Sequence, residues 1–235
     1  MKIKEPYKRL NSLWGIIDCQ HNKLIASKIS GSRVLDVGCG YGSLVDFLKK
    51  EGWEAEGIDN DLESYNVAQK LFPNAKLKLM DAKIIGDYYD NGTFDTIILK
   101  DCLHHLIGEE ASEVYFLNFR RILKSKGRLV VLDPNPIWIL RFARKLILHK
   151  DPEMGLEYAL RLLEEEGFRL KGVNFYELIG LALSGGYVGI QFIPNLKLLN
   201  RFVAFINHRA SIGINRLGLG PFLCWRYLIY ADKNS

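Results

Sequence analysis

The stretch RVLDVGCGYGSLVDFL, residues 33–48, decides the fold of this chain. Apolar residues lead into a carboxylate at Asp36, three glycines follow at alternate positions, and a helix-compatible pattern begins at Ser43. Glycines between a strand and a helix let the backbone turn sharply and let a ligand approach without meeting a Cβ atom. The stretch therefore predicts a strand, a ligand-binding turn and a helix in that order.

The same alternation continues along the chain. Runs rich in β-formers are RVLDV (33–37), WEAEGID (53–59), AKLKLMD (75–81), FDTIILK (94–100), GRLVVLD (127–133), FRLKGVNFYELI (168–179) and FLCWRYLIYAD (222–232). Helical periodicity is found at 7–29, 43–50, 61–71, 110–124 and 153–166. Asn60 followed by Glu63 predicts a capping box at the third of these helices. Alternating strands and helices predict an α/β fold, a parallel sheet with helices on both faces.

Length and composition favour one cytoplasmic domain over residues 1–235. The chain has 48% apolar and 25% charged residues, which is ordinary for a globular protein. No apolar run is long enough to cross a bilayer, and the N-terminus lacks the apolar segment of a secretory signal. Cys19, Cys39, Cys102 and Cys224 are scattered. Their spacing predicts no metal site and no disulfide framework, and it fits a reducing compartment.

Two cofactor classes use glycine turns of this kind. Gly38, Gly40 and Ser43 nearly fit the dinucleotide pattern G-x-G-x-x-G, and Asp59, about twenty residues after the turn, would then hold a ribose. Asp36, however, lies two residues before the first glycine, where it would repel a pyrophosphate. A ligand with a ribose, an amino group and a sulfonium but no phosphate fits these charges better, and S-adenosylmethionine is such a ligand.

Five motifs carry a family resemblance. VLDVGCGYG resembles the first motif of class I S-adenosylmethionine-dependent methyltransferases, especially the ubiquinone-biosynthesis-like group that acts on small molecules. GIDND, MDAK, FDTIILKDCLHHL and RILKSKGRLVVLDP follow in the family's order, over residues 30–133. In the last of them, Ser125 and Lys126 stand where the family prefers Pro-Gly, a difference expected to affect only a turn.

The resemblance implies a Rossmann-like sheet of seven strands, mostly parallel with the last antiparallel, and a cofactor across the carboxyl ends of the first strands. It implies that Asp36 and Gly38 meet the amino-acid end of the cofactor, and that the cofactor passes close to the backbone of Gly40. Asp59 would bind the ribose, and Asp81 the adenine. The complete set implied for the cofactor is Asp36, Gly38, Cys39, Gly40, Asp59, Asn60, Asp81, Ala82 and Lys100.

The acceptor side is marked by His105 and by two unusual segments. The resemblance places His105 near the acceptor, as a general base or as a histidine with only a structural hydrogen bond. The segment 134–150 contains no Asp or Glu, and neither does the stretch from Leu178 to Ala231. About forty residues separate the last two strands, and a connection of that length predicts a helical insertion.

These features suggest four segments within the single domain. They are an N-terminal helical lid (1–30), the cofactor-binding core (31–133), acceptor-side helices (134–167) and an apolar, basic lid insertion (180–220). Tyr7, Trp14 and His21 are candidates for lining the pocket. An apolar and basic cover predicts a greasy acceptor with an anionic group, or contact with an anionic membrane surface. A nucleic-acid partner is disfavoured because the insertion is mostly aliphatic.

The predicted activity is methyl transfer from S-adenosylmethionine to a small or lipid-like acceptor (EC 2.1.1.-), with S-adenosylhomocysteine as product. Two alternatives stay open at this point. One is an NAD(P)-binding oxidoreductase that uses the same glycine turn, and the other is a non-catalytic protein that binds the cofactor and regulates a partner enzyme.

Overall fold

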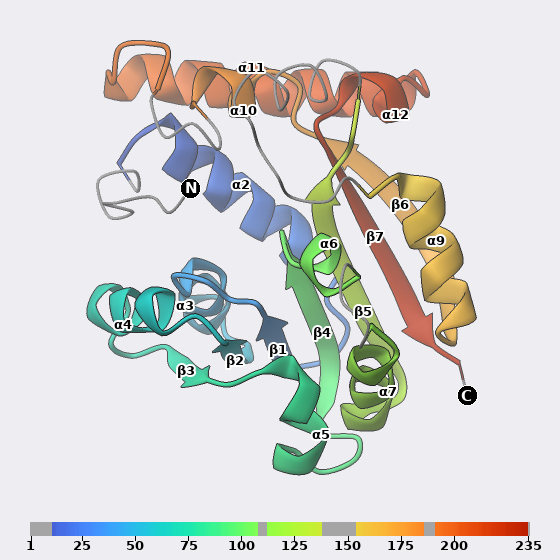
Figure 1. The fold of residues 1–235 in the computed structure, drawn as a ribbon. Helices are drawn as coiled ribbons and strands as arrows, with labels where there is room; N and C mark the ends of the chain where they lie inside the picture. Colours follow the sequence, from blue (N-terminus) through green and yellow to red (C-terminus); the bar gives the residue numbers. More distant parts are fainter. Residues whose placement is uncertain (1–10, 108–111, 138–153, 186–190, 235) are drawn as a thin grey trace. The chain divides into compact units, whose positions relative to one another are not determined.

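The computed structural model describes residues 11–107, 112–137, 154–185 and 191–234. These residues form a seven-stranded sheet in the order β3-β2-β1-β4-β5-β7-β6. Strands β1, β2, β3, β4 and β5 pair in parallel, and β7 runs in the opposite direction (Figure 1). The α/β class and the antiparallel last strand are as the sequence predicts.

All seven strands fall on predicted runs. They are β1 (Arg33–Val37), β2 (Glu54–Asp59), β3 (Lys76–Leu79), β4 (Phe94–Lys100), β5 (Leu123–Pro134), β6 (Phe168–Tyr176) and β7 (Arg226–Lys233). β5 begins four residues earlier than the predicted run and passes through Lys126, whose φ is 60°. Lys126 therefore takes the left-handed conformation that glycine favours, at the position where the family has its Pro-Gly turn.

The described helical elements are α2 (Leu13–Ala26), α3 (Ser43–Lys50), α4 (Leu62–Leu71), η1 (Ala82–Ile84), α5 (Ile85–Tyr88), α6 (Leu103–Leu106), α7 (Ser112–Ile122), α9 (Leu156–Glu165), α10 (Gly180–Leu183), α11 (Lys197–Arg216) and α12 (Gly220–Leu223). The predicted capping box at α4 is wrong. Asp61, not Asn60, is the N-cap residue, and its carboxylate accepts a hydrogen bond from the backbone N–H of Ser64 at 3.0 Å. Asp is as good a cap as Asn, so the pattern alone did not separate the two.

The centre of the sheet is formed by β1 and β4. Val34 and Leu35 on β1, and Ile97 and Ile98 on β4, are completely buried. Neighbouring residues of a strand point to opposite faces, so both faces of these strands are covered. Burial on both faces is typical of a parallel sheet with helices packed around it.

The chain divides into two compact units, which are considered separately. The sheet unit comprises Ile25–Asp133, Asp151–Val173 and Leu228–Ser235, and the helical unit comprises Met1–Leu24, Pro134–Lys150 and Asn174–Tyr227. The sheet unit contains the predicted cofactor core, and the helical unit contains most of α2 and the helices of the insertion, α10, α11 and α12. The single-domain organisation and the lid functions of the segments stay predictions.

Among the residues that the structure describes, no helix is both long enough and apolar enough to traverse a bilayer.

Candidate functional site

The glycine turn after β1 is hydrogen-bonded to the end of β2. The backbone N–H groups of Gly38 and Cys39 both donate to the carbonyl of Ile58, at 2.9 Å each. Gly38 has a φ of 71°, and a Cβ atom there would lie 2.5 Å from the sulfur of Cys102. The turn therefore requires glycine at this position for both conformational and steric reasons.

Gly40 differs from Gly38 because the space beside it is open. Its φ is 51°, and an added Cβ would meet no atom within 4 Å. Its N–H donates to Oδ2 of Asp59 at 2.8 Å, while Oδ1 of the same carboxylate accepts from the N–H of Asp61 at 2.8 Å. The structure thus brings together two residues that the sequence assigns to the cofactor, Gly40 and Asp59, at an accessible stretch of backbone.

The surroundings of the turn are acidic. Asp36 is only 2% exposed on β1. Burial, together with the charges of Asp36 and Asp59, raises the pKa of the Cys39 thiol far above its usual value. Burial, assisted by Asp133, raises the pKa of Cys102 in the same direction. Both thiols are therefore protonated near neutral pH, which excludes them as thiolate nucleophiles.

The end of β3 lies beside the end of β2, at the carboxyl edge of the sheet. The N–H of Met80 donates to the carbonyl of Asp59 at 2.9 Å, so the ends of β2 and β3 are joined. Asp81 is partly exposed and caps η1 by accepting from the N–H of Lys83 at 2.8 Å. Ala82 is buried, whereas Asn60 is exposed.

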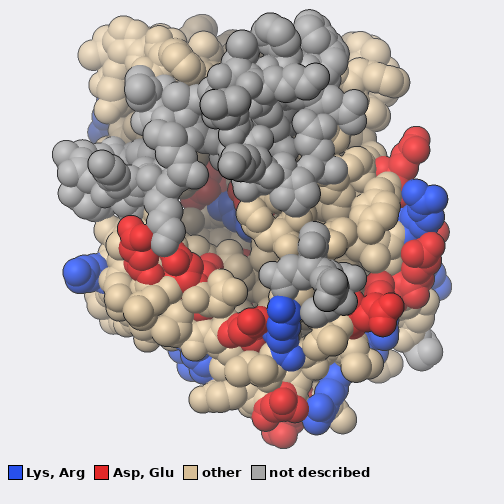
Figure 2. Space-filling view, in the orientation of Figure 1, with Lys and Arg blue, Asp and Glu red and all other residues tan. Residues whose placement is uncertain are grey.

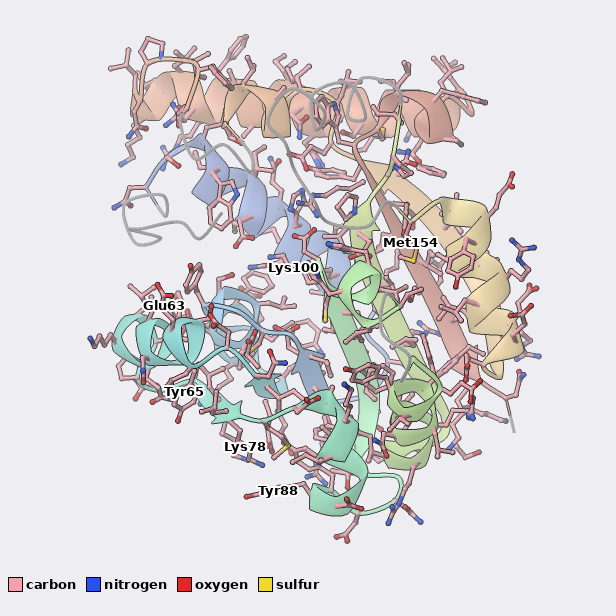
Figure 3. The ribbon with its side chains drawn as sticks, viewed as in Figure 1. Glu63, Tyr65, Lys78, Tyr88, Lys100 and Met154 are labelled. Atoms are coloured by element: carbon pink, nitrogen blue, oxygen red, sulfur yellow. The ribbon has the colours of Figure 1, made fainter. Side chains whose placement is uncertain are left out.

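A buried carboxylate that the sequence patterns did not predict, that of Asp133, holds the segment that follows β4. Lys100 ends the strand beside α6 (Figure 3). The buried carboxylate of Asp133, at the end of β5, accepts from the N–H of Cys102 at 3.1 Å and from the N–H of His104 at 3.0 Å. The same carboxylate lies 3.1 Å from Nδ1 of His104. Burial raises the pKa of Asp133, and the hydrogen bond with His104 acts against that rise.

His104 and His105 have different environments. His104 is 6% exposed and its ring is held by Asp133, whereas His105 is exposed. The two ring centroids are 4.1 Å apart. His105, the residue selected from the sequence, is thus the more accessible of the pair, and His104 is the one whose orientation is fixed. The described residues contain no cluster of three or more metal-ligating side chains.

The helical unit contains a second buried polar group, also missed. Glu177 follows β6 directly, with a φ of 74°, and its side chain is fully buried. Its Oε2 lies 3.0 Å from Nε2 of His21 and accepts from Nε of Arg226 at 3.1 Å. The sequence held one signal of it, since Glu177 is the last acid before the long acid-free stretch. His21 therefore lies beside the buried ion pair of Glu177 and Arg226.

The other residues considered for the acceptor side are less informative. Trp14 lies on α2 and is partly exposed. Tyr7 lies outside the described residues, and so does most of the segment 134–150.

The residues at the edge of β1, β2 and β3 fit a ligand such as S-adenosylmethionine. The open backbone at Gly40 gives room for close approach, and Asp59 offers carboxylate oxygens to hydroxyl donors. The buried carboxylate of Asp36 favours a positively charged group and disfavours a pyrophosphate.

Comparison with known proteins agrees with this interpretation. Residues 17–179 match the family model described as "Methyltransferase domain". A ubiquinone biosynthesis O-methyltransferase of Actinobacillus pleuropneumoniae is 34% identical over 182 residues, which are 74% of this chain and 65% of that protein. The corresponding protein of Vibrio campbellii is 30% identical over 115 residues, 43% of this chain and 49% of that protein. The chain spans 64% or less of the length of the first four curated relatives that it matches.

A solved structure has the same fold. A SAM-dependent methyltransferase of Archaeoglobus fulgidus superimposes with a TM-score of 0.66 at 21% identity, covering 93% of this chain and 94% of that one.

Proposed function

The chain belongs to the class I S-adenosylmethionine-dependent methyltransferases, and we propose that it transfers the methyl group of this cofactor to a small or lipid-like acceptor. The observation that carries the proposal is the pairing of the open backbone at Gly40 with the carboxylate of Asp59, 2.8 Å away. A dinucleotide would also use Asp59 for its ribose, but the buried Asp36 beside the turn opposes a pyrophosphate.

Each cofactor residue has a defined task in this proposal. Asp59 binds the ribose hydroxyls, Gly40 admits the cofactor against the backbone, and Asp36 and Gly38 face its amino-acid end. Asp81 binds the adenine amino group. The adjoining Cys39, Asn60, Ala82 and Lys100 complete the walls of the site. The bound cofactor supplies an electrophilic methyl group on a sulfonium.

The chain's contribution to the transfer is mainly alignment. In-line displacement requires the acceptor atom and the methyl group to be held in contact and away from water, which alone lowers the barrier substantially. His105 is the proposed acceptor-side residue, as a proton acceptor when the nucleophile carries a proton. Asp133 and His104 act by positioning, since they fix the turn from which His105 projects.

The proposed acceptor has an apolar body and an anionic group. The support is the composition of residues 178–231, which are apolar and glycine-rich and contain basic residues without acids. Curated relatives named for ubiquinone biosynthesis support an acceptor of low polarity. Contact with an anionic membrane surface belongs to the same proposal, because a lipid-like acceptor resides in a bilayer. A cytoplasmic location, at the face of that membrane, is part of it.

The test uses methyl-labelled S-adenosylmethionine, the purified protein and a whole-cell extract, followed by partition between organic solvent and water. Label in the organic phase supports a lipid-like acceptor. Label only in the aqueous phase contradicts the lipid-like acceptor and leaves a polar substrate. Cofactor binding without transfer to any fraction would favour the regulatory alternative, and binding of NAD(P) in place of S-adenosylmethionine would favour the oxidoreductase.

A further inference from the structure

The long helix α11 has the reverse of the usual arrangement of polar and apolar faces. Its buried residues are small or polar, namely Asn200, Ala204, Asn207 and Ser211, each at most 1% exposed. These positions recur at intervals of four, three and four residues, so they form one stripe along the helix. A helix on the surface of a globular protein normally buries its large apolar residues instead.

Specific hydrogen bonds fix this orientation. Oδ1 of Asn207 accepts from the backbone N–H groups of three consecutive residues, Leu178, Ile179 and Gly180, at 3.0 Å each. One turn further along, Oγ of Ser211 accepts from the N–H of Glu177 at 3.0 Å. Asn215 likewise accepts from the N–H of Phe175 at 3.0 Å. The helix cannot rotate about its axis without breaking these bonds, so the exposure of its opposite face is a fixed feature of the helical unit.

The opposite face carries large apolar side chains. Leu198 is 81% exposed, Phe202 62% and Phe205 58%. They follow the same spacing as the buried stripe, shifted by two residues, which is half a helical turn. Leu217, Leu219 and Phe222, which follow the helix in the sequence, are exposed as well. In the face shown in Figure 2, the part of α11 that is visible is mostly uncharged, whereas acidic and basic residues gather over α4 and α9.

The charged residues of α11 are all basic. Lys197, Arg201, Arg209 and Arg216 are exposed. Arg209 falls on the same stripe as Leu198, Phe202 and Phe205, four residues after the last of them. The segment from Leu178 to Ala231 that carries these charges contains no acid. This charge distribution is complementary to an anionic surface and opposes pairing with a second copy, which would bring arginines together.

We propose that this docking face, composed of Leu198, Phe202, Phe205, Leu217, Leu219 and Phe222 with Arg201, Arg209 and Arg216, binds the surface of an anionic lipid bilayer. The helix lies in the plane of the interface, with its apolar side chains at the level of the acyl chains. The arginines extend their stems along the apolar surface and place their guanidinium groups among the lipid phosphates. A helix of 20 residues is about 30 Å long and offers the contact in one rigid piece.

This inference rests on the proposed function in one respect, since a lipid-like acceptor is the reason for the protein to be at a membrane. Binding to lipid is measured without a methyl acceptor and without turnover. Failure of the docking face therefore shows in the flotation experiment, whatever the result of the partition experiment. Failure of the proposed acceptor class shows as label confined to the aqueous phase, whatever the result of flotation.

The test is flotation of the purified full-length protein with two kinds of vesicle, phosphatidylcholine alone and equal parts of phosphatidylcholine and phosphatidylglycerol. We expect binding to the anionic vesicles to be at least tenfold stronger, and to weaken as salt is added. The variant Leu198→Ser/Phe202→Ser/Phe205→Ser should lose about a hundredfold in binding. Replacing Arg201 and Arg209 with Gln should cost about fivefold for each arginine.

The matched control is Leu62→Ser/Leu117→Ser, which removes apolar residues of similar exposure, 57% and 59%, from α4 and α7 of the sheet unit. It should bind anionic vesicles like the wild type. Thermal unfolding and binding of S-adenosylhomocysteine confirm that all variants are folded. The proposal is overturned if the wild type does not float with anionic vesicles, or if the Leu198→Ser/Phe202→Ser/Phe205→Ser variant floats equally well. It is also overturned if light scattering shows that this variant instead dissociates a dimer of the wild type, since the face would then join two copies.

Discussion

Replacing Asp59 with Ala is expected to weaken the binding of S-adenosylmethionine by about 1–3 kcal/mol, or roughly 5- to 150-fold in Kd. The two oxygens of Asp59 accept from Gly40 and Asp61, at 2.8 Å each. A carboxylate has about four acceptor positions, so two are left for the ribose hydroxyls. Hydrogen bonds to a charged acceptor are stronger than those between neutral groups, which sets the upper part of the range.

The assay is isothermal titration of S-adenosylmethionine into the wild type, Asp59→Ala, Asp59→Asn and Asp61→Ala. Asp61→Ala is the matched control, because it removes a carboxylate two residues away that caps α4 through Ser64 at 3.0 Å. Loss of that cap should reduce the free energy of unfolding by about 1 kcal/mol and leave the Kd unchanged. Asp59→Asn should fall between the wild type and Asp59→Ala, since it keeps one acceptor oxygen without the charge.

Two results would refute this reasoning. An Asp59→Ala variant with the wild-type Kd would remove Asp59 from the cofactor site. An Asp61→Ala variant that loses as much affinity as Asp59→Ala would show that the effect comes from distortion of the chain around α4 and not from a contact with the cofactor.

Four further predictions follow from the geometry. Gly40→Ala should cost about 1 kcal/mol in unfolding free energy, because a left-handed alanine is strained, but should reduce cofactor affinity by more than tenfold; equal affinity in titration would contradict the open approach. Asn207→Ala should lower the free energy of unfolding in urea by at least about 3 kcal/mol, because three backbone N–H groups lose their acceptor at about 1–3 kcal/mol each; a loss below ~1 kcal/mol would count against the fixed orientation of α11. Iodoacetamide at neutral pH should modify the exposed Cys19 long before Cys39, whose pKa is raised and which therefore stays a thiol; mass spectrometry of the modified peptides decides. Asp133→Asn should lower kcat with little change in cofactor Kd and should alter the pH profile of kcat; an unchanged profile would leave the carboxylate with a purely structural role.

Local patterns in the sequence were sufficient for the sheet. β1 and β4 were predicted residue for residue, because a buried parallel strand is a short apolar run bounded by turn residues. The position of Asp59 and Asp81 at the carboxyl edge was predictable for the same reason, since Asp59 ends β2 and Asp81 lies two residues after the end of β3. Where the prediction failed at α4, Asn60 and Asp61 are adjacent residues of equal capping ability, and only the structure distinguishes them, through the extended backbone of Asp61 and its hydrogen bond from the N–H of Ser64.

The polar clusters were not predictable in this way, because their members are distant in the sequence. Asp133 and His104 are 29 residues apart, and Glu177 and Arg226 are 49 residues apart. A side chain that accepts hydrogen bonds from the backbone of another element produces no periodic pattern in the sequence of its own helix or strand. Such contacts become visible only when the strand order is known, since β4 and β5 are neighbours in the sheet.

The orientation of α11 shows how such contacts can override a helix's apolar pattern. Turning Leu198, Phe202 and Phe205 inward would gain about 4.5–9 kcal/mol from burial, at about 1.5–3 kcal/mol for each side chain. The same rotation would leave five backbone N–H groups in residues 175–180 without their acceptors. At about 1–3 kcal/mol each, that loss is roughly 5–15 kcal/mol, and Arg209 would be carried inward as well. The hydrogen bonds therefore determine which face is buried. The apolar side chains that are held outward in this way can still gain free energy when they are buried elsewhere. A bilayer surface can bury them without any rotation of the helix.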